Sequence, residues 1–365
     1  MGVAHWRGQY GEAALRTGYA ENMRISPCLE LWPAGERGLY RGGELIWQLP
    51  DAPTNGTQSS DRKLPVFWDW SWRAVLRAQG PDARKWLHGM LTANVRDLKP
   101  GLHAPALALN ARGHMIATLQ LACIAADTFL LLTEETQRFS LYAQLRRYII
   151  REKVEFCDLE EKLCALAIAG HSENINGPGL PDFRPKPGEI FTLPDQSSYW
   201  ACHSWPDPDC PRQIYEWLAP PPMILETARQ WTTGAGPRLE PAILQEQRRI
   251  EAGVPLWQAD IQERMLPQEA RQTAAVDFHK GCYLGQEIVE RIRARGQVHR
   301  GLFRIRSRQA LRAGDSLLRG QDSAGEVTSA TALRADLWAA MAILRHGEPG
   351  ETLTTITGGS VTVLD

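Results

Sequence analysis

The sequence has no long hydrophobic run and no excess of charge of either sign. No apolar stretch approaches the ~20 residues that cross a bilayer, which excludes an ordinary transmembrane helix. The opening stretch MGVAHWRGQYGEAALR lacks the apolar core of a secretory signal. Because 41 Lys and Arg balance 42 Asp and Glu, net charge points to neither a nucleic-acid nor a membrane partner. We therefore expect a cytoplasmic protein.

Cysteine is scarce and follows no metal-binding pattern. The seven thiols are Cys28, Cys123, Cys157, Cys164, Cys202, Cys210 and Cys282. An odd number without any CxxC argues against a disulfide framework and against a closed structural zinc site. Cys202 and His203 lie eight and seven residues before Cys210, which fits no standard metal site. We therefore predict no metal site.

The chain of 365 residues exceeds the usual size of one hydrophobic core, so we expect two or three domains. Strand and helix patterns mix with hairpin-length connections, which favours an α+β fold over a doubly wound sheet. After Gly301, short segments separated by Gly and Asp are typical of a small β-barrel. We divide the chain into a Gly-rich segment that ends in a polar linker, two α+β parts and the barrel: 1–63, 64–160, 161–300 and 301–365.

Three amphipathic segments predict helices. Pro81 suits the first turn of a helix in GPDARKWLHGMLTANV. A second helix near residues 138–149 would place Phe139 on its apolar face. Pro241 begins a third helix and Gly253 ends it.

The stretch KGCYLGQE, residues 280–287, places one thiol among glycines and basic residues. Gly281 and Gly285 bracket Cys282, so the backbone there is free to turn sharply and approach a ligand. A helix is predicted to follow, and its positive end together with Lys280 would favour the thiolate. A thiolate attacks electrophiles, ligates metals or carries an intermediate.

Other interpretations of this thiol stand beside the reactive one. A lone cysteine is more often a small buried hydrophobe, and Gly-Cys-Tyr is also compatible with a plain tight turn. His279 or His299 would serve as the base for Cys282 in a hydrolase or thiol transferase. A single thiolate does not hold an iron–sulfur cluster without further ligands, so no resident cluster is predicted.

The sequence KGCYLGQEIVERIRARG resembles the signature of the folate-binding YgfZ family, in which K-G-C-[FY]-x-G-Q-E precedes an arginine. Further segments resemble the same family: GPDARKWLHGMLTANVRDLKPG, with Asn94 at the usual Asp position, RRIEAGVPLWQADI, LPQE and GEVTSA. The resemblance extends from about Leu64 to residue 365, and the first 63 residues match poorly.

This resemblance implies a fold, a cofactor and partners. YgfZ proteins are similar in fold to the T-protein of the glycine cleavage system, an aminomethyltransferase that uses tetrahydrofolate. The expected architecture has three parts around a central channel, ends in a β-barrel, and binds tetrahydrofolate or a derivative. The implied role is the assembly or maintenance of iron–sulfur enzymes, including those that thiolate tRNA. The expected partners are iron–sulfur client or assembly proteins, without direct nucleic-acid contact.

The resemblance also suggests roles for single residues. Glu251 matches the glutamate with which the T-protein holds the pterin, the alternative being a surface glutamate near a helix end. Arg291 and Lys280 would hold the glutamate tail of the folate or polarise Cys282, unless they form only a solvated basic face. The candidate catalytic residues are Cys282 and Lys280. The candidate cofactor-binding residues are Glu251, Arg291, Gly281, Gly285, Gln286 and Glu287.

The acidic pair of the T-protein, in its G-G-x-I-D-D-L pattern, has no counterpart here. The matching stretch begins at Gly113 and places Ala117 and Thr118 at the two Asp positions. Neither side chain carries a charge that would stabilise a cationic intermediate. No Asp or Glu occurs between Asp97 and Asp127. We therefore predict that aminomethyl transfer is absent or vestigial and that the chain is not a classical turnover enzyme.

The sequence is thus interpreted as a folate-binding accessory protein that supports iron–sulfur clusters, with Cys282 as its key residue. A tetrahydrofolate-dependent aminomethyltransferase remains one alternative, and a cysteine hydrolase or thiol transferase another. The transferase would turn over and tolerate Cys282→Ser. The hydrolase would be trapped by an electrophile and would depend on His279 or His299.

Overall fold

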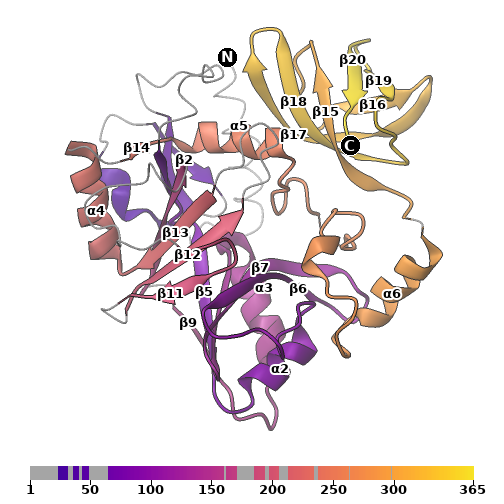
Figure 1. Ribbon diagram of the computed structural model, residues 1–365. Coiled ribbons are helices and arrows are strands. Elements are labelled where there is room, and N and C mark those ends of the chain that lie inside the picture. Colours follow the sequence, from indigo (N-terminus) through magenta and orange to yellow (C-terminus); the bar gives the residue numbers. More distant parts are fainter. Residues whose placement is uncertain are drawn as a thin grey trace.

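The computed structural model describes residues 24–31, 36–40, 43–48, 65–159, 162–170, 185–193, 197–204, 213–233, 237–262, 264–296 and 298–365. These residues form two large sheets with flanking helices and a closed β-barrel (Figure 1). The predicted α+β class and the barrel are confirmed. The predicted linker at 51–63 lies outside the described residues. Before it, a small sheet contains β1 (Arg24–Ile25), β2 (Glu36–Tyr40) and β3 (Gly43–Gln48).

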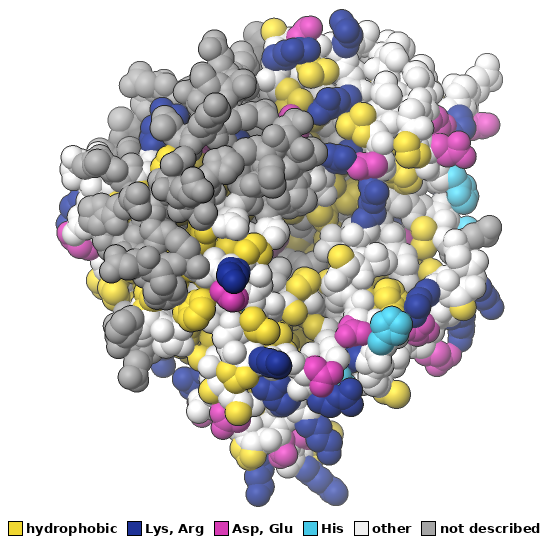
Figure 2. All heavy atoms as spheres, in the orientation of Figure 1, with side chains coloured by type: hydrophobic (Ala, Val, Ile, Leu, Met, Phe, Trp, Pro, Cys, Tyr) yellow, Lys and Arg dark blue, Asp and Glu magenta, His cyan; other side chains and the backbone are white. Residues whose placement is uncertain are grey.

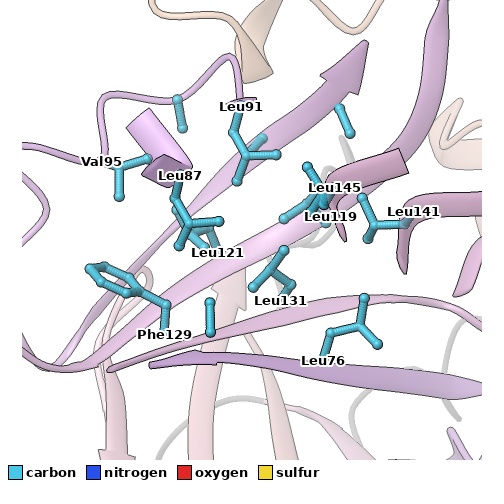
Figure 3. Packing of buried hydrophobic residues seen from close by; sticks show 14 of the residues in the cluster. Leu76, Leu87, Leu91, Val95, Leu119, Leu121, Phe129, Leu131, Leu141 and Leu145 are labelled. Carbon is cyan, nitrogen blue, oxygen red and sulfur yellow. The ribbon is translucent and has the colours of Figure 1, made fainter. Parts of the chain in front are cut away.

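The first large sheet is antiparallel, with the strand order β6-β7-β8-β5-β9. Its strands are β5 (Arg73–Gln79), β6 (Leu102–Leu109), β7 (Met115–Ala125), β8 (Thr128–Glu134) and β9 (Glu155–Asp158). Two helices, α2 (Ala83–Met90) and α3 (Glu135–Arg146), cover one face. Figure 3 shows Leu87 and Leu145 packed against Leu121 and Leu131 of the sheet. Each such fully buried leucine contributes about 1.5–3 kcal/mol, so this face fixes both helices.

The apolar face of α3 differs from the prediction. Phe139 is 43% exposed, whereas Leu141 and Leu145 are buried. The buried side of α3 is turned away from the predicted one because of Arg138. Its buried guanidinium donates 2.6 Å hydrogen bonds to both Glu135 and Asp158. A buried arginine must keep its carboxylate partners, and this requirement outweighs the burial of one aromatic ring.

The second large sheet has the strand order β11-β12-β13-β10-β4-β14. Its strands are β4 (Val66–Asp69), β10 (Cys164–Gly170), β11 (Ile190–Thr192), β12 (Tyr199–Ser204), β13 (Gln213–Ala219) and β14 (Arg238–Leu239). Helix α4 (Pro221–Thr233) packs on β10 and on the 3-10 helix η2 (Pro27–Leu31). A hydrophobic cluster with members from both large sheets, including Trp68, Leu132 and Ala167, joins them face to face. The short strand β4 pairs with β10, so the chain enters the second sheet before it builds the first.

Helix α5 (Ala242–Ala252) ends at Gly253, whose φ of 70° is left-handed, as the sequence predicted. Arg249 of this helix is fully buried and donates to Asp260 at 2.6 Å and to Ser329 at 2.9 Å. Ser329 in turn donates to Asp260 at 2.7 Å. The segments RRIEAG, LWQADI and GEVTSA therefore meet in one network that joins α5 to the barrel.

The barrel has the strand order β15-β18-β17-β16-β19-β20. Its strands are β15 (Gly301–Ser307), β16 (Ser316–Arg319), β17 (Asp322–Arg334), β18 (Leu337–Leu344), β19 (Thr352–Thr355) and β20 (Ser360–Val363). Between α5 and the barrel lie η5 (Thr273–Ala275) and α6 (Gln286–Arg295), and α6 sits beside the β6–β7 end of the first sheet (Figure 1). Among the described residues, no helix is long and apolar enough to cross a membrane.

Candidate functional site

A cavity of about 390 Å³ lies where the two large sheets meet the end of α5 and the segment that follows it. Its lining includes Trp70, Leu132 and Ile214 from the sheets, and Val254 and Gln272 from the segment after α5. Figure 2 shows hydrophobic side chains gathered around a hollow in this face of the molecule. This volume is within the range of small-molecule sites, which have a few polar groups in a mostly apolar wall.

Three tryptophans of the sequence VFWDWSW form one wall of the cavity. The rings of Trp68 and Trp70 are stacked with centroids 6.0 Å apart, and those of Trp70 and Trp72 are 5.3 Å apart. The guanidinium of Arg73 lies 4.8 Å from the Trp72 ring centre and 5.1 Å from that of Trp70. This wall is suited to a flat aromatic heterocycle, which gains stacking and dispersion energy on such rings.

A buried ionic cluster lies behind the tryptophans. Glu216 is fully buried and accepts hydrogen bonds of 2.6 Å from Arg73 Nε and 2.7 Å from His203 Nε2. Burial alone would raise the pKa of Glu216, but the charge of Arg73 and the hydrogen bond from His203 outweigh it and lower this pKa to about 2. The cluster therefore holds a permanent carboxylate that fixes Arg73 and His203, both of which line the cavity.

His103 extends this cluster toward β12. Its ring centre lies 4.6 Å from that of His203, and its Nε2 donates to the carbonyl oxygen of Cys202 at 2.7 Å. Burial and then the neighbouring His203 lower the pKa of His103 to about 4. His103 is therefore neutral at pH 7, and its second ring nitrogen lies 3.3 Å from the cavity residue Gln120.

One carboxylate lines the cavity from β8, the strand next to β7. Ala117 is fully buried, while Thr118 lines the cavity, and its backbone N–H donates to Gln137 Oε1 on α3 at 2.6 Å. Glu134, at the end of β8, lines the same cavity and pairs across the sheet with Arg73. A carboxylate is therefore present at the cavity although β7 has none. Glu134 lies beyond the interval between Asp97 and Asp127, which contains no acidic residue.

The thiol loop of KGCYLGQE is anchored by Lys280. Its ammonium donates to the carbonyl oxygens of His88 and Leu91, each at 2.6 Å, and of Ala93 at 2.8 Å. These three bonds use every ammonium hydrogen and satisfy carbonyls at the end of α2. Lys280 is only 6% exposed, and burial lowers its pKa to about 8. These contacts favour an anchoring role over the catalytic role that the sequence suggested.

Cys282 itself is exposed and free. The loop beneath it is tightly fitted, because Gly285 has a φ of +83° and a side chain there would meet Asn110 O at 2.5 Å. His88 contacts this loop from the end of α2, and its Nε2 lies 3.6 Å from the point where a Gly281 side chain would begin. His279 and His299 are exposed. The sequence patterns did not indicate His88 as a neighbour of this loop, because it precedes the loop by almost 200 residues.

The other predicted cofactor-binding residues do not line the cavity. Arg291 and Glu287 form an i,i+4 ion pair at 2.6 Å, on the exposed side of α6. Gln286 and Gly281 belong to the thiol loop, which meets the β6–β7 turn. Glu251 ends α5, with its carboxylate 4.0 Å from Arg306. This arginine is an opposite charge beside Glu251 at the end of α5 where the helix dipole disfavours a carboxylate.

The sequence thus predicted the thiol loop and, through the family resemblance, a central channel, but not the side chains that line the cavity or support its wall. The missed residues are Trp68, Trp70, Trp72, Arg73, His103, Glu134, His203 and Glu216. One signal was available, since VFWDWSWR places three of the 13 tryptophans at alternate positions of an extended segment. Within the described residues, no three His, Cys, Asp or Glu side chains are grouped so as to hold a metal ion.

Comparisons with known proteins agree with this architecture. The family described as "GCVT N-terminal domain" matches residues 62–175. The tRNA-modifying protein YgfZ of Photorhabdus laumondii is 27% identical over 243 residues, which cover 64% of this chain and 68% of that protein. The YgfZ of Edwardsiella ictaluri is 27% identical over 253 residues. The predicted resemblance to the YgfZ family is confirmed.

Two further relatives extend the likeness. An iron–sulfur cluster assembly factor IBA57 homolog, mitochondrial, from Pyricularia oryzae is 29% identical over 238 residues, and the match covers about half of that protein, 54%. The glycine cleavage system aminomethyltransferase T of Bartonella henselae has a TM-score of 0.82 at 20% identity, over 94% of this chain and 97% of that one. The YgfZ-like chain therefore has the T-protein fold.

Proposed function

We propose that this chain is a YgfZ-type accessory protein that binds a folate in the tryptophan-walled cavity and supports iron–sulfur clusters in client enzymes. The observation that carries the proposal is the cavity itself, on a T-protein fold, with Trp70 and Arg73 on its wall. The relatives named as tRNA-modifying YgfZ and as an iron–sulfur assembly factor support the accessory role.

The lining of the cavity fits a folate. A pterin is flat and aromatic, and the three tryptophans offer a surface on which it would stack. Its polar edge needs donors and acceptors, which Gln120, Gln245 and His203 provide at the cavity wall. A reduced folate supplies one-carbon chemistry when bound. The side chains of this chain would bind it, orient it and limit its contact with water.

Cys282 would act separately, on the outer surface. Its loop is held rigidly by Lys280 and by Gly285, while the thiol remains exposed. A fixed loop with an accessible thiol is suited to contact a second protein, because little ordering entropy is lost on association. We assign Cys282 to the contact with an iron–sulfur client or assembly protein, and the cavity to the folate.

The test combines rescue and binding. A strain of the source organism without this gene would receive the wild type, Cys282→Ser or Thr118→Trp at equal expression. The readout is the activity of an iron–sulfur enzyme, such as one that thiolates tRNA. We expect rescue by the wild type alone. Calorimetric titration with folic acid should detect binding to the wild type and to Cys282→Ser but not to Thr118→Trp, whose indole would fill the cavity. Full rescue by both variants would refute the proposal.

The aminomethyltransferase alternative has one observation in its favour, the Glu134 carboxylate in the cavity. We expect no release of ammonia and methylenetetrahydrofolate from an aminomethylated carrier protein. Turnover that persisted in Cys282→Ser and disappeared in Glu134→Gln would establish the transferase instead.

The hydrolase alternative requires covalent trapping of Cys282 that depends on His279 or His299. Both histidines are exposed, whereas His88 Nε2 lies against Gly281 of the loop.

A further inference from the structure

A second cavity, of about 460 Å³, lies between the end of α5 and the barrel strands β15 and β18. It shares the lining residues Gly253, Pro255 and Gln272 with the tryptophan-walled cavity, so the two cavities adjoin at these residues. Its charged lining residues are Arg271, Arg304 and Asp365. This second cavity plays no part in the function proposed above.

Arg304 is held in place from several sides. Its stem packs against Gly253, where a side chain would come within 2.6 Å of Arg304 Cδ. Its Nη1 donates to the carbonyl oxygen of Glu251 at 3.0 Å. Its Nε and Nη2 then face the two carboxylate oxygens of Asp365, at 2.7 and 2.5 Å. This is the bidentate geometry with which a guanidinium recognises a carboxylate.

Arg271 approaches the same carboxylate from the other side. Its Nη1 lies 3.3 Å from Asp365 Oδ1, and its guanidinium lies 5.9 Å from the Phe303 ring centre. The backbone φ of Arg271 is +56°, a left-handed conformation that costs a non-glycine residue on the order of 1–3 kcal/mol. The fold therefore keeps an arginine at the cavity at an energetic cost, where a glycine would be relaxed.

The carboxylate that occupies this arginine pair is partly exposed to solvent. Asp365 has 37% of its side chain exposed, and Arg271 has 50%. The hydrogen bond from Arg304 lowers the pKa of Asp365, so the carboxylate is ionised at neutral pH. A charged ligand of the same chemistry would meet a preformed pair of donors, and it would have to displace only a partly solvated side chain.

We propose that Arg271 and Arg304 form a carboxylate subsite for the glutamate tail of the folate, and that Asp365 occupies this subsite as an internal competitor. The inference rests on the proposed folate function. It replaces Lys280 and Arg291 as the tail-binding residues, because the ammonium of Lys280 is saturated by carbonyls and Arg291 pairs with Glu287 on the outside of α6. The pterin would lie among the tryptophans, and the tail would lie beyond Gly253 and Pro255.

The test compares two probes by calorimetric titration of the full chain. Folic acid carries the carboxylate tail, and its bis-amide keeps the pterin and aminobenzoyl groups without the charges. Asp365→Asn should lower the Kd of folic acid about three- to tenfold relative to the Kd of the bis-amide. The reason is that the arginines no longer pair with a carboxylate of the protein, and one charge-assisted hydrogen bond is worth roughly this factor in affinity. Arg271→Gln should weaken folic acid by about the same factor relative to the bis-amide. Asp336→Asn and Arg334→Gln are matched controls, because this exposed pair lies elsewhere on the barrel.

Each outcome is decisive. The subsite is supported if the affinity for folic acid relative to the bis-amide rises in Asp365→Asn and falls in Arg271→Gln. The same ratio must stay unchanged in the two control variants. A ratio that stays constant while both probes bind overturns the subsite and leaves the folate cavity in place. Failure of the wild type to bind either probe overturns the folate function and the subsite together. Arg271→Gln changes an exposed side chain, so it gives an answer even if Asp365→Asn does not fold.

Discussion

The ammonium of Lys280 lies 2.6 Å from the carbonyl oxygen of Leu91, 189 residues earlier in the chain. Together with bonds to His88 and Ala93, it fastens the thiol loop to the end of α2. The signature lysine is thus part of the structure that presents Cys282, and its three donors are already used.

Replacement of Lys280 by methionine should destabilise the protein. Three carbonyls at the end of α2 would lose their donor in a buried place, at a cost of about 3 kcal/mol. Urea unfolding measures this loss, and Lys99→Met, at an exposed position, should have no effect. If Lys280→Met kept full stability but lost rescue of the iron–sulfur enzyme, the lysine would be catalytic as the sequence suggested.

The glycine before α6 should tolerate no side chain. At Gly285→Ala the new methyl group would meet Asn110 O at 2.5 Å and Gly113 Cα at 3.1 Å, in a left-handed backbone. We expect a loss of at least about 2 kcal/mol in the free energy of unfolding. Gly296→Ala is the matched control, because Gly296 is also left-handed at +69° but has open space around it. Its loss should be about 1 kcal/mol. Equal losses in both variants would show that backbone strain alone, and not the contact with the β6–β7 turn, sets the cost.

Acid should destabilise the protein through His103. The pKa of His103 is about 4 in the folded chain and near 6.5 when unfolded, so the unfolded state binds more protons between these values. Stability is therefore lost as pH falls from 6.5 toward 4, by up to about 3 kcal/mol from this group.

Comparison of variants isolates this contribution. His103→Gln keeps a donor for the Cys202 carbonyl but does not titrate, so its stability should fall less between pH 6.5 and 4.5. His299→Gln, at an exposed residue, should follow the wild type. Glu216 adds little in this window, because its pKa of about 2 places most of its loss at lower pH. A His103→Gln curve parallel to that of the wild type would contradict a neutral, half-buried histidine at this position.

Alkylation should distinguish Cys282 from the other described thiols. Cys282 is exposed, whereas Cys28, Cys123 and Cys202 are fully buried, and burial raises the pKa of Cys202 to about 12. Iodoacetamide in the native state should therefore modify the peptide that contains Cys282 first, as measured by mass spectrometry of timed digests. Protection of this peptide, or equal labelling of Cys202, would contradict an accessible thiol on a stable loop. Cys282→Ser confirms the peptide assignment.

Local sequence determined the features that depend on neighbouring residues. Gly253 ends α5 in a left-handed conformation, and Glu287 pairs with Arg291 one helical turn away. Spacing along the chain carries this information because capping and i,i+4 contacts are local. The thiol loop, the β-barrel and the T-protein fold were also predicted, the fold through a resemblance of long motifs.

Tertiary structure alone decided where the cavity lies and which side chains line it. Glu216 and Arg73 are 143 residues apart, and Arg304 meets Asp365 across 61 residues. No periodicity encodes such pairs, because they depend on how two sheets, a helix and a barrel pack together. The same reason explains why Phe139 is exposed. The helical pattern predicted it on the buried side of α3, but the buried ion pairs of Arg138 orient the helix so that Phe139 faces outward. The sequence by itself determined the elements and the thiol loop, and packing determined the binding surfaces.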